Sequence, residues 1–201
     1  MKTDYSKKAT NQYIRERFDN DTERFSNLET GQQTTIDAPL TMELCTEAAM
    51  YANPHAKERI LPQTGGTVTL IQDDMRNLDL LDNHFDIILA AATLHHLRDD
   101  DDWELMFNKI YKALKPGGSF WVSDLVTHDS EFIKKLFEDK YSSYLEALGG
   151  PEYRQKVLDY VNYEDTPRSL NYQLALLAKV GFSTIDVLHK NSCFAAFGAI
   201  K

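Results

Sequence analysis

Three polar side chains stand where two apolar runs end, the place at which parallel strands present groups to a ligand. His95 and His96 follow the run at 85–92, and Asp124 lies near the end of the run at 119–126. A neutral imidazole in such a place can accept a proton from a substrate. We therefore name His95, His96 and Asp124 as candidate catalytic residues. Lining the substrate, or supporting the fold, is the alternative role for the two histidines.

The two histidines are adjacent, and this bears on metal binding. Neighbouring side chains on an extended segment point in opposite directions, so at most one of them is expected to face a cleft. That arrangement makes a poor two-ligand site, and we predict no metal. The acids at 99–102 fit the N-terminus of a helix, because an apolar stripe begins at Trp103 and the spaced oxygen ligands of a calcium loop are missing.

The elements that position these residues alternate between strand and helix. Continuous apolar runs at 68–71, 85–92 and 119–126 are typical of buried parallel strands. Apolar residues spaced by 3, 4 and 7 from Trp103 to Leu114 predict a helix between the last two runs. A crossover of this length favours parallel pairing of the strands that it joins.

The rest of the chain is predicted to surround this unit with helices. The first 30 residues are polar with scattered aromatic residues, which suits a helical arm. Further helices are predicted at 37–53, 130–148, 153–161 and 170–181, and an antiparallel strand pair at 184–189 and 193–200. The fold class is therefore α/β, in a single domain over 1–201 with a mostly parallel sheet closed by an antiparallel strand.

Composition narrows the function classes. The net charge of −9 and the pI near 5.1 argue against nucleic-acid binding, which needs Lys and Arg to neutralise phosphates. No run approaches the roughly 20 apolar residues of a membrane span, and the N-terminus lacks the apolar centre of a signal peptide. We expect a cytoplasmic protein whose partner is a small-molecule substrate; a homodimer is compatible with the sequence.

The order of these motifs resembles the class I S-adenosylmethionine-dependent methyltransferases. Asp74-Met75 after a strand, an apolar strand running into Leu94-His95-His96, and a Lys-Pro-Gly-Gly turn at 115–118 occur together with the final antiparallel pair. The resemblance implies a Rossmann-like methyltransferase sheet behind an N-terminal helical arm. It places the arm at 1–57 and the core at 58–201. Within the core, a helical insert at 130–165 would lie over the cofactor side.

The same resemblance implies a cofactor and its contacts. S-adenosylmethionine would donate a methyl group to a small acceptor, the carboxylate of Asp74 would bind the adenine amine, and small side chains at Ala90 and Ala91 would leave room for the methionyl end. The cofactor-binding residues that it implies are Asp73, Asp74, Met75, Ala90, Ala91 and Leu94.

One part of that family's pattern is missing. None of the nine glycines forms the Gly-x-Gly loop that holds the methionyl end, and the residues between Pro54 and Thr67 are too few for two strands and their helices. Roughly 40 residues are lacking by the usual dimensions of such elements. Either the protein is a shortened variant or the sequence is an incomplete record of a longer chain. We predict that the family's first two strands are absent and that the cofactor binds weakly or not at all.

Three segments in the second half also resemble the carboxy-S-adenosylmethionine synthase branch, namely those at 108–111, 179–182 and 193–198. That branch reads a carboxylate with an arginine on the last helix, where this chain has Leu176, so methyl transfer is favoured over carboxyl transfer. The alternatives are a non-catalytic binding or oligomerisation module with the same fold, or an enzyme of the carboxy-S-adenosylmethionine synthase type.

Overall fold

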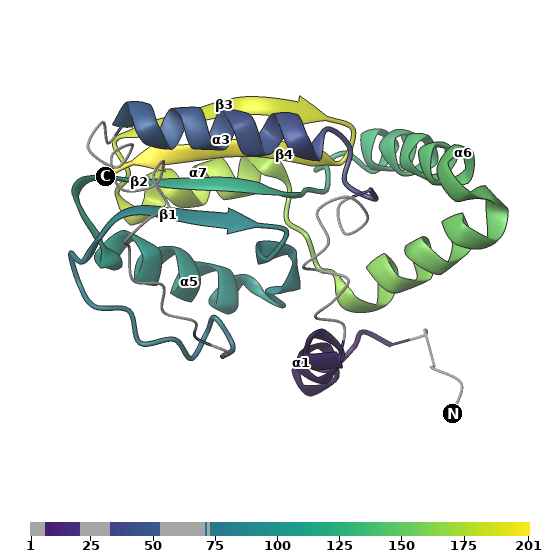
Figure 1. Ribbon diagram of the computed structural model, residues 1–201, viewed down its shortest axis with the longest axis horizontal. Coiled ribbons are helices and arrows are strands. Elements are labelled where there is room, and N and C mark those ends of the chain that lie inside the picture. The colour runs from purple at the N-terminus through teal and green to yellow at the C-terminus, as the bar shows by residue number, and fades with distance from the viewer. Residues whose placement is uncertain (1–6, 21–32, 53–70, 72) are drawn as a thin grey trace, which may run out of the picture.

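A four-stranded sheet forms the centre of the molecule (Figure 1), seen in a computed structural model that describes residues 7–20, 33–52, 71 and 73–201. The strand order is β1-β2-β4-β3, with bounds Phe85–Ala91, Leu114–Leu125, Phe194–Ile200 and Thr184–Asn191. β1 and β2 pair in parallel, whereas β4 is antiparallel to both of its neighbours. The α/β class, the parallel pair and the antiparallel closing strands are thus confirmed.

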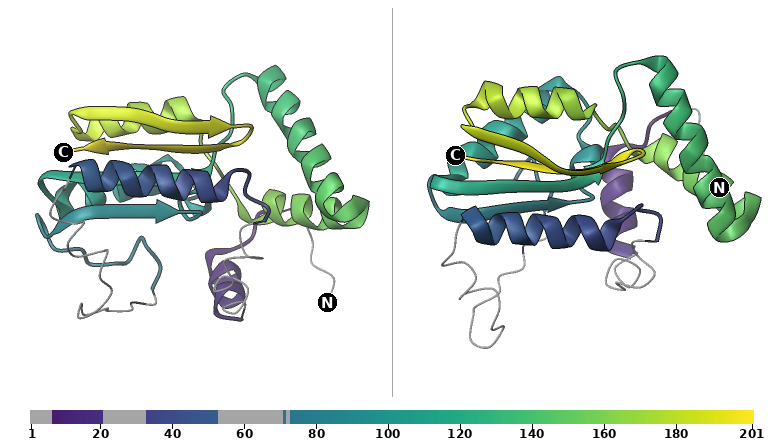
Figure 2. Two further views of the ribbon diagram at one scale, coloured as in Figure 1. Left: turned by 45° about the horizontal axis from the view of Figure 1, so that its top comes forward. Right: turned by 90° about the horizontal axis from the view of Figure 1, so that it is seen from above.

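Helices cover both faces of this sheet (Figure 2). On one face lie α5 (Asp100–Ala113) and α7 (Leu170–Val180), and the opposite face carries α3 (Ala38–Ala52). Alternation along β2 explains the two layers, because successive side chains of a strand point to opposite faces. Phe120 packs with α5 and α7 in the main core, and Trp121 packs against Cys45 of α3.

The ends of α5 and α7 follow from local chemistry. The Asp99 side chain accepts a hydrogen bond from the backbone N–H of Asp102 and so caps α5. Gly181 ends α7 in the left-handed conformation, as predicted. β2 begins at Leu114, earlier than the predicted 119, because residues 115–118 form an irregular paired extension in which the register to β1 shifts.

Two helical elements lie at the end of the sheet where β1 and β2 finish (Figure 1). α1 (Asn11–Asn20) is one described helix of the arm predicted at 1–57, and α3, the other, packs against the sheet. α6 (Glu131–Glu164) is one long helix with a kink at Gly150, whose φ of 84° breaks the helical geometry just before Pro151. The two predicted helices of the insert are therefore present, divided where the glycines predict.

The predicted strand at 68–71 and the junction at 57/58 lie outside the described residues, apart from Ile71, which is in no strand. Among the described strands β1 has no second neighbour, and Leu89 on it is 49% exposed. Within that same part of the chain, no helix combines the length and apolar character that a membrane span requires.

The two thiols give a test of the packing. Burial raises the pKa of Cys45 and of Cys193 to about 11, against roughly 8.5 for a free thiol. At pH 8 the thiolate fraction should therefore fall more than about a hundredfold on folding, and the thiolate is the reactive form. We expect an aromatic disulfide reagent to label the native protein at least that much more slowly than the protein in concentrated urea. Equal rates in the two samples would contradict the packing around α3 and β4.

Candidate active site

The two histidines lie on a short helical turn and not on an extended segment. β1 ends at Ala91, Ala92 has a positive φ of 50°, and Leu94–His96 then forms the 3₁₀ helix η1. Side chains of a 3₁₀ helix are only about 120° apart around its axis, so two neighbours can share one side. The rings of His95 and His96 lie 4.2 Å apart, and both line one cavity. The expectation that at most one would face a cleft is wrong.

Asp124 holds η1 against the end of β2. Its buried carboxylate accepts hydrogen bonds from the backbone N–H groups of Leu94 and Leu125, each at 2.7 Å, and it also binds Nδ1 of His95. A third backbone N–H, that of Thr93, donates to the same carboxylate at 3.3 Å. The structure thus joins the three predicted catalytic residues, with Asp124 as the group that orients His95.

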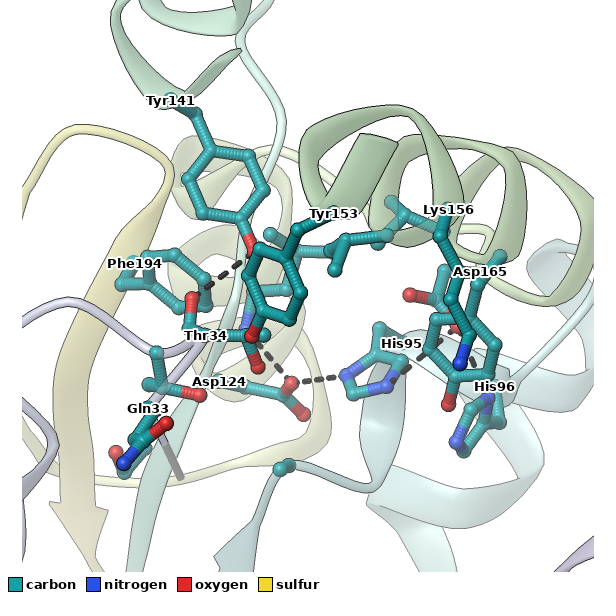
Figure 3. A pocket seen from close by; sticks show the side chains of 17 residues that line it. Gln33, Thr34, His95, His96, Asp124, Tyr141, Tyr153, Lys156, Asp165 and Phe194 are labelled. Atoms are coloured by element: carbon teal, nitrogen blue, oxygen red, sulfur yellow. Dashed lines mark hydrogen bonds and ion pairs between the residues drawn. The ribbon is translucent and has the colours of Figure 1, made fainter. Parts of the chain in front are cut away.

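A fourth polar side chain, Asp165, joins this group from the end of α6. Its Oδ1 atom lies 3.3 Å from Nδ1 of His96 and 3.7 Å from Nε2 of His95, and the side chain is 3% exposed (Figure 3). Asp165 was not among the predicted site residues, because an acid that follows a helix has no local pattern that links it to a turn some 70 residues earlier.

The charges of the four groups depend on one another. Burial alone would lower the pKa of His95, but the carboxylates of Asp124 and Asp165 outweigh it and raise this pKa to about 9. Burial would raise the pKa of Asp124, yet His95 holds it below its ordinary value. Burial, together with the positive charge of His95, lowers the pKa of His96. At neutral pH, His95 and Asp124 are therefore a charged pair and His96 is the histidine that can accept a proton.

Arg98 fastens the end of α6 to η1. Its guanidinium donates hydrogen bonds to the backbone oxygen of Glu164 at 2.7 Å and to Oγ1 of Thr166 at 2.9 Å. The N–H of Thr166 in turn donates to the backbone oxygen of His95 at 2.7 Å. These bonds hold Asp165 beside the histidines, so Arg98 is a supporting residue that sequence reasoning did not identify.

The cavity beside the histidines has a volume of about 410 Å³. Side chains of α6 form one wall of the cavity (Figure 3). From this wall, the hydroxyl of Tyr141 donates a hydrogen bond to the backbone oxygen of Thr34, another lining residue, at 2.9 Å. The predicted insert at 130–165 therefore does cover the end of the sheet. Other lining residues are Gln33, Thr35, Ala92, Ser123, Leu125, Tyr153, Lys156, Val157, Tyr160, Val161 and Phe194.

The residues predicted for the adenine end lie elsewhere. The carboxylate of Asp74 accepts from Nε of Arg76 at 2.8 Å, and this arginine also contacts Asp102 at 3.2 Å. Asp73 is exposed and accepts the N–H of Asp74, while Met75 packs against the main core. None of the predicted three lines the cavity.

Some of the residues predicted to contact the methionyl end of the cofactor are packed in or against the main core. Leu94 is 2% exposed within the main core, and Ala90 packs against that core. Ala91 is exposed but does not line the cavity, whereas its neighbour Ala92 does. Since Asp74 is bound to Arg76 and no Gly-x-Gly exists in the sequence, the described residues do not fit S-adenosylmethionine in the manner that the family implies.

Comparison with known proteins gives the class. A methyltransferase domain family matches residues 31–122. The curated carboxy-S-adenosyl-L-methionine synthase of Vibrio parahaemolyticus is 27% identical over 138 residues, which cover 67% of this chain and 54% of the relative. The enzyme of the same name from Helicobacter hepaticus is 30% identical over 124 residues, which cover 61% of this chain and 51% of the relative. The solved mitomycin 7-O-methyltransferase is 20% identical at a TM-score of 0.44, covering 66% of this chain and 33% of its own.

By sequence, the chain is thus similar to class I S-adenosylmethionine-dependent methyltransferases, a class whose methyl donor is S-adenosylmethionine. The particular curated relatives are carboxy-S-adenosyl-L-methionine synthases, and this chain spans about half of their length. The resemblance seen in the motifs from Asp74 onward is confirmed.

Proposed function

We propose that the cavity beside His96 is the acceptor site of a methyltransferase and that it binds a small molecule. The observation that carries this proposal is the buried group of His95, His96, Asp124 and Asp165 at the wall of a cavity of about 410 Å³. The cavity lies at the carboxyl ends of two parallel strands, where α/β proteins bind their ligands. Its volume is within the range of small-molecule sites.

The lining predicts the kind of acceptor. Tyr153 and Phe194 offer aromatic surface, Lys156 offers a positive charge, and His96 offers a ring nitrogen that can accept a proton. An acceptor with an aromatic body, an anionic substituent and an ionisable O–H or N–H group would use all three features. Acceptor binding is the part of the family's activity that these residues support.

A non-catalytic binding module is the second candidate. It is favoured by the bond between Asp74 and Arg76, which occupies the carboxylate that the family resemblance assigns to adenine. Carboxyl transfer has less support, because Leu176, at the position that the resemblance assigns to an arginine, is 5% exposed within the core.

A substitution that fills the cavity tests acceptor binding. Val157 lines the cavity, so Val157→Trp should exclude a ligand and weaken the binding of small phenolic carboxylates at least tenfold by calorimetry. Leu148→Trp is the matched control, because this exposed residue lies on the same helix outside the cavity. If no phenolic carboxylate binds the parent protein, or if both variants bind alike, the cavity is not the acceptor site.

A further inference from the structure

We propose that His95, His96 and Asp165 bind one divalent transition-metal ion, with Zn²⁺ as the reference metal. Two imidazoles and one carboxylate are a donor set that binds zinc in enzymes. One donor atom from each residue lies within 4.8 Å of the other two. The proposal does not rest on the acceptor function, because protein groups alone would hold the ion.

The distances fit one small cation. Two ligands on a tetrahedral zinc ion, each at roughly 2.0–2.1 Å, lie about 3.3 Å apart. Oδ1 of Asp165 is 3.3 Å from Nδ1 of His96 and 3.7 Å from Nε2 of His95. The donor nitrogens of the two histidines lie within 4.8 Å of one another, so side-chain rotation on metal binding would have to bring all three atoms to a common centre.

Asp124 supplies the supporting interaction that metal-binding histidines usually have. It accepts a hydrogen bond from Nδ1 of His95, which leaves Nε2 of the same ring directed toward Asp165 (Figure 3). A carboxylate behind a ligating histidine fixes its tautomer and strengthens it as a donor. A metal ion would replace the proton on Nε2, so that binding releases this proton to solvent.

The carboxylate of Asp165 is a second, independent indication. Its Oδ1 atom is buried, and no donor among the described residues makes a well-directed hydrogen bond to it. Its neighbours are the two histidine rings, at 3.3 and 3.7 Å, and a bound cation would satisfy this buried oxygen better than they do. The nearby Glu164 would not compete with Asp165 for the metal ion, because its carboxylate lies 2.8 Å from Nε of Arg17.

The cluster would leave part of the coordination sphere open. Zinc binds four ligands, and three protein donors come from the described residues. Both histidines and Asp165 line the cavity of about 410 Å³, so water or a ligand in that cavity could occupy a fourth position. This arrangement is typical of zinc sites that act on a ligand and differs from closed structural sites.

Titration with Co²⁺, a visible-absorbing substitute for Zn²⁺, tests the site in the metal-free protein. We expect one Co²⁺ per chain with intense d–d absorption of the tetrahedral type, and displacement of Co²⁺ by one equivalent of Zn²⁺. His96→Gln and Asp165→Asn should each weaken binding at least tenfold. His84→Gln and Asp139→Asn change an exposed histidine and an exposed carboxylate outside the cluster, and they should leave binding unchanged.

Circular dichroism of each variant separates loss of the site from loss of the fold. Folded His96→Gln and Asp165→Asn proteins with weakened Co²⁺ binding support the site, even if no acceptor or cofactor ever binds. Absence of stoichiometric Co²⁺ binding by the folded parent protein overturns the proposal, as does binding that all four variants retain. If both cluster variants fail to fold, the parent titration decides alone.

Discussion

Replacing Asp124 with asparagine is expected to lower the free energy of unfolding of the metal-free protein by about 3–5 kcal/mol, the usual cost of breaking a buried ion pair. One oxygen accepts the N–H of Leu94, and the other accepts the N–H of Leu125 and binds His95. Whichever way an asparagine amide is turned, its NH₂ group faces one of these donors. The variant therefore loses the charge and also leaves a buried donor unpaired.

Urea unfolding of the parent and the Asp124→Asn protein measures this difference. Asp86→Asn is the matched control, because Asp86 also carries an ion pair, with Lys115 at 3.0 Å, but its side chain is 41% exposed. Exposed pairs contribute roughly 0–1 kcal/mol. Equal and small losses in the two variants would mean that Asp124 does not join η1 to β2.

Arg17→Ala is the substitution with the second largest expected effect, a loss of about 2–4 kcal/mol. The Arg17 guanidinium lies 2.8 Å from the Glu164 carboxylate, whose side chain is 1% exposed, and it donates to the Tyr160 hydroxyl at 2.8 Å. Without the arginine a carboxylate stays buried beside Asp165 with its main cationic partner removed. Because burial already raises the pKa of Glu164, protonation should offset part of the cost.

Thermal unfolding and limited proteolysis would measure the release of α1 from the end of α6. Arg15→Ala removes an exposed arginine from the same helix and should change neither result. If Arg17→Ala unfolds at the parent temperature and resists proteolysis equally, the arm does not support the end of α6.

Local patterns predicted the elements that position the site. The apolar spacing from Trp103 and the acids before it predict α5, and the Gly-Gly-Pro sequence at 149–151 predicts the kink of α6. The parallel pairing of β1 and β2 follows from the helical crossover between them. These features depend on neighbours in the sequence, which is why they could be inferred without the structure.

Contacts between distant segments could not be inferred in this way. Asp165 meets His96 because α6 turns back at Gly150 and Arg98 fastens its end to η1. The turn of His95 and His96 into one 3₁₀ helix depends on Asp124, which accepts the N–H groups that start that turn. Both effects come from tertiary hydrogen bonds, and no residue spacing encodes them.

The residues predicted to be catalytic and the residues predicted from the family resemblance to bind the cofactor have different outcomes. His95, His96 and Asp124 come together at the cavity, whereas Asp74 is bound to Arg76 and Leu94 lies in the core. The catalytic and cofactor assignments stay predictions, but the geometry supports the first group more than the second. Among the described residues, the proposed acceptor cavity is thus accompanied by an incomplete set of cofactor donors.

Calorimetric titration of S-adenosylhomocysteine into the folded 201-residue chain tests this central claim most directly. The missing glycine loop and the occupied Asp74 carboxylate remove several hydrogen bonds worth about 1 kcal/mol each, enough to move a micromolar site toward millimolar affinity. We therefore predict a dissociation constant near or above 1 mM, by this order-of-magnitude argument. A micromolar dissociation constant would contradict the account, because it would require a cofactor site that the described residues do not form.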